Sequence, residues 1–232
     1  MQNMPYLLQK VLKGVVLTFA LLSSLALAAP KARQAEVKPA KVVVLKGDSV
    51  VGREKAESER CIECHGLQGQ GAEHANSAEA KFAKLAGQYP DYILKQIRDF
   101  RSGARKHDQM AIMARSVSDE DVLDIAAYFG SQLVMNGKDG DLHEVGKELY
   151  QSGDATRGIT ACVSCHGVKG KGLEGNKLAP VLGGQEWRYL DQQLRNWRAG
   201  DRRNSLDGAM NRATAALTDK EIESLADYLS GL

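Results

Sequence analysis

The sequence predicts an all-α fold made of two similar halves, and three observations carry this prediction. Apolar residues recur at helical spacing along much of the 232-residue chain, and no segment sustains the alternation typical of a strand. The segment CIECHGLQGQG returns later as CVSCHGVKGKG, which indicates an internal repeat. The helix-start pattern SDEDVLDIAAYF likewise has a counterpart, TDKEIESLADYL. Two homologous helical domains explain these repeats most simply, and we expect them at residues 47–136 and 137–232.

Composition narrows the class of protein. Charged residues make up 26% of the chain and hydrophobic residues 43%, which is ordinary for a folded protein and excludes low-complexity disorder. Lys plus Arg number 31 against 29 for Asp plus Glu, so the formal net charge of +2 gives no strong electrostatic case for nucleic-acid binding. Aromatic residues are only 6%, which is few for a core unless something else fills it.

The N-terminus has the pattern of a targeting segment. Lys10 and Lys13 precede an uncharged run at 14–29, which is shorter than the roughly 20 apolar residues of a membrane-spanning helix. The run contains the small-residue pattern Ala-Leu-Ala that signal peptidase recognises. We therefore expect residues 1–28 to be a Sec-type signal peptide that directs export to the periplasm. An uncleaved membrane anchor is the alternative.

Residues 29–46 are expected to form a basic linker, because cations and two prolines dominate this segment. A mobile or loosely docked tether is the favoured interpretation. The alternative is an arm that touches an acidic partner or an anionic membrane surface, without stable insertion into the membrane. The one strand-like run, residues 42–45, is expected to belong to this tether.

The helices of both halves can be placed from their starts and their apolar faces. Pro90 suits the first turn of a helix. Ser118 and Thr218 are typical N-caps, with Asp121 and Glu221 as their capping-box partners. Two matching apolar stripes at helical spacing are Tyr89, Ile93, Ile97 and Phe100, and Tyr189, Leu190, Leu194 and Trp197. Two matching faces are expected to be buried: Val122, Ile125, Ala126 and Phe129, and Ile222, Leu225, Ala226 and Leu229.

Each half carries the motif C-x-x-C-H, the attachment signature of c-type heme. Two cysteines three residues apart can form thioethers with the two vinyl groups of a porphyrin, and the adjacent histidine then faces the iron. Zinc or a redox disulfide is the alternative for a lone C-x-x-C, but here the pairs lie far apart and each has its own histidine. The sequence therefore predicts two covalently bound heme c groups, held by Cys61, Cys64, His65, Cys162, Cys165 and His166.

The second axial ligand decides between an electron carrier and a catalyst. Met110 and Met210 each lie the same number of residues before a helix cap, so we expect both to be axial ligands. A methionine that merely fills the core is the alternative. In the first half Met113 and His107 compete with Met110, but neither has a counterpart in the second half. Methionine with histidine raises the reduction potential relative to two histidines and leaves no open iron position, which predicts electron transfer and no enzyme activity.

Two further groups of residues are expected around the hemes. The second ring nitrogen of each proximal histidine needs an acceptor, and the candidates are the backbone carbonyls of Pro180 and, in the first half, Ala83. Four arginines on the predicted helices either meet the heme propionates or are solvated surface charges: Arg98, Arg101, Arg195 and Arg198.

Together these residues resemble the diheme cytochrome c4 group of exported bacterial electron carriers. The resemblance covers residues 48–232 and rests on the two C-x-x-C-H motifs, the LAGQ and LGGQ segments and the methionines before the two capped helices. It implies two tandem class I cytochrome c domains related by a pseudo-two-fold axis, with hemes close enough for intramolecular electron transfer. Carried over by position, the axial pairs are His65 with Met110 and His166 with Met210.

The resemblance also implies a role, although the chain departs from the family pattern at Ala83, where proline is usual, and at Ala56, which stands where the second half has Tyr150. The implied role is to shuttle electrons between a membrane donor, such as a quinol-oxidising complex, and a terminal oxidase or reductase. One alternative is a diheme subunit of a larger dehydrogenase, of the flavocytochrome c sulfide dehydrogenase type. Another is a diheme peroxidase, which would need an open axial position.

Overall fold

The computed structural model describes residues 46–71, 82–137 and 143–232. The predicted signal peptide at 1–28, nearly all of the predicted linker and the strand-like run at 42–45 lie outside these residues. Within them the chain forms helices, with one isolated antiparallel bridge between Asp154 and Ile159. The prediction of an all-α fold is confirmed.

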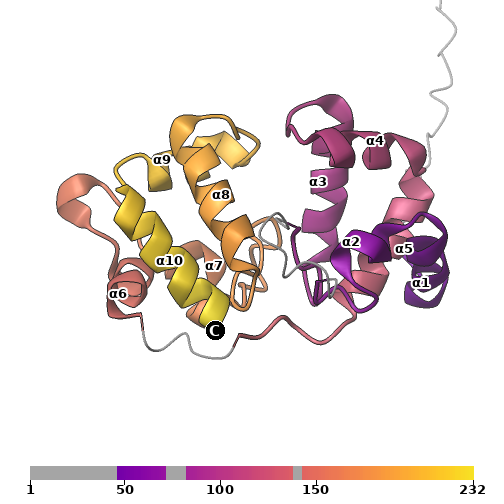
Figure 1. Ribbon diagram of the computed structural model, residues 1–232, viewed down its shortest axis with the longest axis horizontal. Coiled ribbons are helices and arrows are strands. Elements are labelled where there is room, and N and C mark those ends of the chain that lie inside the picture. Colours follow the sequence, from indigo (N-terminus) through magenta and orange to yellow (C-terminus); the bar gives the residue numbers. More distant parts are fainter. Residues whose placement is uncertain (1–45, 72–81, 138–142) are drawn as a thin grey trace, which may run out of the picture. The chain divides into compact units, whose positions relative to one another are not determined.

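The helices follow the same order in both halves, and Figure 1 traces them along the chain. The first half contains α1 (Ser49–Ser58), α2 (Cys61–His65), α3 (Pro90–Ser102), α4 (Asp108–Ser116) and α5 (Asp119–Gly130). The second half contains α6 (Glu144–Ser152), η3 (Ala155–Arg157), α7 (Val163–His166), η4 (Val168–Gly170), α8 (Trp187–Ala199), η5 (Leu206–Gly208), α9 (Ala209–Thr214) and α10 (Asp219–Gly231).

The core of the first half forms where α1 and α3 pack on α5. Helix α5 starts where predicted, because Ser118 and Asp121 form a complete capping box. Its expected apolar face is buried. At the crossing of α1 and α5 there is no space for a side chain, since a Cβ at Gly52 would overlap the carbonyl oxygen of Asp124.

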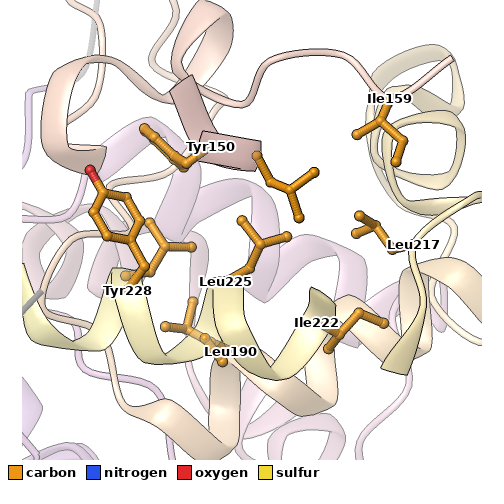
Figure 2. Packing of buried hydrophobic residues seen from close by; sticks show 10 residues of the cluster. Tyr150, Ile159, Leu190, Leu217, Ile222, Leu225 and Tyr228 are labelled. Carbon is orange, nitrogen blue, oxygen red and sulfur yellow. The ribbon is translucent and has the colours of Figure 1, made fainter. Parts of the chain in front are cut away.

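The second half repeats this arrangement with α6 and α8 packed on α10. Thr218 and Glu221 form the matching capping box. Figure 2 shows Ile222, Leu225 and Tyr228 along α10, with Tyr150 among the buried residues around them. Gly146 takes the place of Gly52, because a Cβ there would overlap the carbonyl oxygen of Ser224.

One segment of the second half has no counterpart in the first and was not anticipated. Between α6 and the second C-x-x-C-H motif, the chain forms η3 and the bridge between Asp154 and Ile159. Ile159 is buried in the core of this half (Figure 2). Arg157 fastens the segment by pairing with Asp154 at 2.6 Å and with Glu221 at 2.5 Å. The ion pair with Glu221 also ties the segment to the first turn of α10.

Two glutamines exchange matched hydrogen bonds between the halves. The Gln88 side chain donates to the carbonyl of Val181 at 3.0 Å and accepts from its N–H at 2.9 Å. The Gln185 side chain donates to the carbonyl of Lys84 at 2.9 Å and accepts from its N–H at 2.7 Å. Gln88 and Lys84 correspond in the repeat to Gln185 and Val181, so the contact returns with the roles exchanged. This reciprocity is the signature of the expected pseudo-two-fold relation.

Candidate heme-binding sites

Each C-x-x-C-H motif forms a short helix that ends at a glycine. Helix α2 ends at Gly66 and α7 at Gly167, both with positive φ, of 79° and 75°. A Cβ at either glycine would overlap the carbonyl oxygen of a second glycine, Gly71 or Gly172. The N–H groups of those second glycines donate to the carbonyls of His65 and His166, at 2.9 Å and 2.7 Å. The glycine-rich stretch after each motif therefore folds back and closes a tight loop over the histidine backbone.

Both motif histidines are buried and held by one ring nitrogen. His65 Nδ1 lies 2.7 Å from the carbonyl oxygen of Ala83, and His166 Nδ1 lies 2.8 Å from that of Pro180. These are the predicted acceptors, so that prediction is confirmed. Because a carbonyl only accepts, Nδ1 carries the proton and Nε2 presents its lone pair. Burial lowers the pKa of both histidines, which favours the neutral ring that a metal requires.

The four cysteines are free thiols, and each pair divides in the same way. Cys61 and Cys162 pack against the hydrophobic cores of their halves, and burial raises the pKa of each thiol to about 11. Cys64 is less enclosed and Cys165 is exposed. Each motif thus presents one sulfur toward the core and one toward the surface, next to a buried histidine. This donor set fits a porphyrin that lies partly in the core and is bonded along one edge.

The two methionines lie on corresponding short helices. Met110 is on α4, which packs against α3, and Met210 is on α9, which packs against α8. Both side chains are half-buried. The backbone N–H of Met110 donates to His107 Nδ1 at 3.3 Å, and that of Met210 donates to the Ser205 hydroxyl at 3.1 Å. Each methionine is therefore fixed at the start of its helix by a side chain that precedes it.

His107 has a role that the sequence analysis did not give it. The ring caps α4 and lies edge-on to Phe100 at 6.4 Å between centroids, so it is not merely a solvated loop histidine. Met113 is also half-buried on α4. Of the two residues that compete with Met110, His107 is thus already engaged through Nδ1 in supporting the Met110 backbone.

The expectation that the helix arginines are solvated surface charges is wrong for Arg101 and Arg198, which have specific partners in the chain. Arg101 donates to the carbonyls of Ala114 and Val117 at 2.8 Å and 2.9 Å, and also binds Asp119. Arg198 likewise donates to the Leu217 carbonyl at 2.8 Å and to Asp219 at 2.5 Å.

These two arginines clamp the chain between the methionine helix and the capped helix that follows it, so they are not merely solvated. Arg195 is paired with carboxylates, and Arg98 is exposed. The repeat placed the clamp residues in corresponding positions, but their partners come from the tertiary fold.

Two other arginines, which the sequence analysis missed, are buried between the halves. Arg105 donates to Gln96, Tyr189 and Gln193, at 2.8 to 3.0 Å. Arg202 mirrors it with Gln193, Tyr92 and Gln96, at 2.7 to 3.1 Å. The recurrence of Gly-x-Arg after each preceding helix was the sequence signal that marked them.

The charge of this arginine cluster is poorly balanced by the chain itself. Arg105 and Arg202 are 8% and 6% exposed, and neither occurs in an ion pair among the described residues. The nearby Asp99 carboxylate is paired with Lys95. Burial raises the pKa of the Tyr189 phenol, but the two guanidinium groups outweigh this and hold its pKa below the ordinary value. The cluster is positive and rich in hydrogen-bond donors, which suits carboxylate groups from a bound molecule.

No helix in the described part of the chain combines the length and the hydropathy needed to cross a membrane.

Comparison with known proteins identifies similar chains across both halves. The Cytochrome c family matches residues 50–132 and 144–232. A relative from Thiocapsa roseopersicina named Cytochrome c4 is 39% identical over 187 residues, which is 80% of this chain and 93% of the relative. A Thiosulfate dehydrogenase electron acceptor from Stutzerimonas stutzeri is 35% identical over 176 residues, covering 74% of this chain and 78% of the relative.

A solved structure shares the fold as well as the sequence. The crystal structure of reduced recombinant cytochrome c4 from Pseudomonas stutzeri superposes with a TM-score of 0.71 at 36% identity. The match covers 80% of this chain and 99% of that one, so it includes both halves in one alignment.

Proposed function

Because the chain belongs to the cytochrome c family and is a diheme electron-transfer protein with two covalently bound heme c groups, we propose that it shuttles electrons in the periplasm between a respiratory donor complex and a terminal oxidase or reductase. The observation that carries this proposal is the pair of buried histidines, each held through Nδ1 by a backbone carbonyl so that Nε2 is available to iron. The same arrangement occurs in both halves, as expected if both hemes serve one purpose.

We assign the eight predicted site residues to heme attachment and ligation. The thiols of Cys61, Cys64, Cys162 and Cys165 form the thioethers. Nε2 of His65 and of His166, together with the sulfur of Met110 and of Met210, would ligate the two irons. When bound, each heme supplies an iron that alternates between the ferrous and ferric states without a change of ligands. Since the chain fills both axial positions, it takes part in electron transfer and is not an enzyme.

The buried arginines Arg105 and Arg202 are candidates to bind the heme propionates. Among the described residues, Arg105 and Arg202 are the buried guanidinium groups that lack a carboxylate partner, and the phenols of Tyr92 and Tyr189 lie within the same cluster. Carboxylates that entered this cluster would be paired and hydrogen-bonded, which is what burial of a charge requires. We assign the propionate-binding role to these residues, in place of Arg101 and Arg198.

The proposed location rests on the sequence of residues 1–28, which has the features of a Sec-type signal peptide. In a compartment where thiols are not kept reduced, four unprotected cysteines would risk oxidation. Their attachment to heme therefore suits such a compartment. The basic linker at 29–46 would then be the N-terminal arm of the mature protein. N-terminal sequencing of the mature protein tests this assignment, and cleavage after Ala28 is expected.

A second candidate follows from the name of one relative. The relative from Stutzerimonas stutzeri is called a Thiosulfate dehydrogenase electron acceptor, so this chain is a candidate acceptor for a dehydrogenase instead of a quinol-oxidising complex. Stopped-flow reduction by each purified donor separates the two candidates. The true donor reduces the protein much faster, and a dehydrogenase subunit would also remain bound to its partner through gentle purification.

Ligand substitution tests the proposed sites directly. Met110→Ala and Met210→Ala should each remove part of the weak far-red band of methionine-ligated ferric heme, while Met113→Ala serves as the matched control and keeps it. Both methionine variants should retain two hemes by pyridine hemochrome assay, because the thioethers remain. An unchanged far-red band in Met110→Ala, or fewer than two hemes in the unaltered protein, contradicts the proposal.

A further inference from the structure

The carbonyl that supports each proximal histidine belongs to a peptide group that also contacts the opposite half. In the first half, the carbonyl of Ala83 accepts from His65 Nδ1 at 2.7 Å. The N–H of that same peptide group is the N–H of Lys84, and it donates to Gln185 Oε1 at 2.7 Å. One planar amide thus joins His65 in the first half to a glutamine in the second.

The second half repeats this chain of hydrogen bonds in the opposite direction. The Pro180 carbonyl accepts from His166 Nδ1 at 2.8 Å. The N–H on the other side of the same amide belongs to Val181, and it donates to Gln88 Oε1 at 2.9 Å. Each histidine is therefore linked, through one peptide group, to a side chain of the other half.

Both glutamines are held firmly enough to act on that peptide. Gln88 and Gln185 are 3% and 4% exposed. Each Nε2 donates to the carbonyl of the residue whose N–H the same side chain accepts. Each Oε1 also accepts from the backbone N–H of the next residue, Tyr89 at 3.1 Å or Glu186 at 2.9 Å. The side-chain amide has almost no freedom to turn away.

A hydrogen bond at one end of an amide strengthens the bond at the other end. When Oε1 accepts from the peptide N–H, electron density shifts toward the carbonyl oxygen of that peptide. The oxygen then accepts more strongly from the histidine, which makes the ring a better electron donor to iron and favours the ferric state. The glutamine of one half can therefore affect the reduction potential of the heme in the other.

We propose that Gln88 and Gln185 are positioning residues that set the reduction potential of the heme in the opposite half. Gln88 acts on the heme ligated by His166, and Gln185 acts on the heme ligated by His65. This inference rests on the proposed assignment of the two histidines as axial ligands. The contact falls on the one peptide that carries the histidine acceptor, and the two-fold relation repeats it in both halves.

The test is a redox titration of Gln88→Leu and Gln185→Leu in the full heme-loaded protein, with the two hemes distinguished by their hyperfine-shifted NMR signals. Gln88→Leu should lower the ratio of oxidised to reduced heme on His166 by about threefold at a fixed solution potential. This corresponds to a rise of about 28 mV at 59 mV per tenfold change. The heme on His65 should move much less. Gln185→Leu should shift the heme on His65 in the same direction, and the heme on His166 should move much less.

Gln70→Leu is the matched control, because the Gln70 side chain donates to the Leu133 carbonyl at 2.8 Å but contacts neither histidine support. Equal shifts of both hemes, or a shift only in the heme of the mutated half, would overturn the proposal. Should a leucine variant not fold, Gln88→Glu decides the question. It keeps an oxygen acceptor for the Val181 N–H, and it should shift the same heme in the opposite direction.

The wild-type spectrum distinguishes this inference from the proposed function. Two hemes with histidine and methionine ligands in the unaltered protein support the proposed function, whatever the glutamine variants do. If those ligands are present and the crossed shifts are absent, only the inference about Gln88 and Gln185 fails. Faster exchange of the His166 Nδ1 proton in Gln88→Leu, with exchange of the His65 Nδ1 proton unchanged, is a second readout.

Discussion

Arg101 offers a direct test of how the fold holds the methionine helix of the first half. Its guanidinium group bridges the end of α4 and the start of α5 by donating to the carbonyls of Ala114 and Val117 and by binding Asp119. In Arg101→Gln the shorter neutral side chain cannot reach both carbonyls. We therefore expect the segment that carries Met110 to loosen, and the first half to lose stability.

The size of the effect follows from the two carbonyl contacts. A hydrogen bond from a charged donor contributes about 1.5 to 3 kcal/mol when it is protected from water. The Arg101 side chain is 30% exposed, so water partly replaces the lost bonds, and we reduce the sum of the two by about half. The expected loss in the free energy of unfolding is about 1.5 to 3 kcal/mol. The Asp119 side chain is 63% exposed, so its ion pair is given no share.

Guanidinium chloride denaturation of the ferric protein can follow the two halves separately. The far-red band reports methionine ligation, whereas both tryptophans, Trp187 and Trp197, lie in the second half. Arg101→Gln should lose about half of the far-red band at a lower denaturant concentration than the wild type. Arg98→Gln is the control, because Arg98 is exposed on the same helix and should change stability by at most about 0.5 kcal/mol. If the two variants unfold together, the clamp does not hold α4.

Two further predictions concern the second half. Gly146→Ala should destabilise this half by about 3 kcal/mol or more, because the new Cβ would overlap the Ser224 carbonyl. We expect the purified variant to carry one heme instead of two. Gly175→Ala is the control and should keep both hemes, because there is open space around Gly175. Glu221 has its pKa lowered from 4.5 to about 2 by its hydrogen bond to Arg157, so its contribution to stability is complete above pH 4.5 and is lost as the pH falls toward 2. Denaturation between pH 6 and pH 2 measures this loss, which should be smaller in Glu221→Gln.

Most of the local structure could be predicted because it depends on short-range rules. The capping boxes at Ser118 and Thr218 fix the starts of α5 and α10 through side chains three residues apart. The histidine acceptors at Ala83 and Pro180 could be predicted from the repeat, since the second half supplied the proline that marks the position. In each case the residues that carry the signal are also the residues that form the contact.

The partners of long side chains could not be predicted in this way. The same sequence pattern allowed Arg101 to bind a propionate, water or a backbone carbonyl, and only the position of α4 decides for the carbonyls. Arg105 and Gln88 were visible as repeated residues, but their contacts cross between the halves. A repeat shows that two positions are equivalent and does not show that they face one another. The bridge at Asp154 has no counterpart, so the repeat held no information about it.

The places where the halves differ bear on the hemes themselves. In the second half the Tyr150 hydroxyl donates to the carbonyl of Gly167, directly after the proximal histidine, at 2.6 Å. The first half has Ala56 in that helix, and Tyr128 from α5 donates instead to the carbonyl of Leu67, one residue further along, at 2.5 Å.

The loop that carries each histidine is therefore braced at a different peptide. Together with Ala83 in place of a proline, this gives the two irons unequal surroundings, and we expect unequal reduction potentials. Since Gln88 and Gln185 link each histidine to the opposite half, an asymmetry in one half would also be felt by the heme of the other. The difference between the two potentials should accordingly change when either glutamine is replaced, even though neither glutamine lies in the half whose heme it affects.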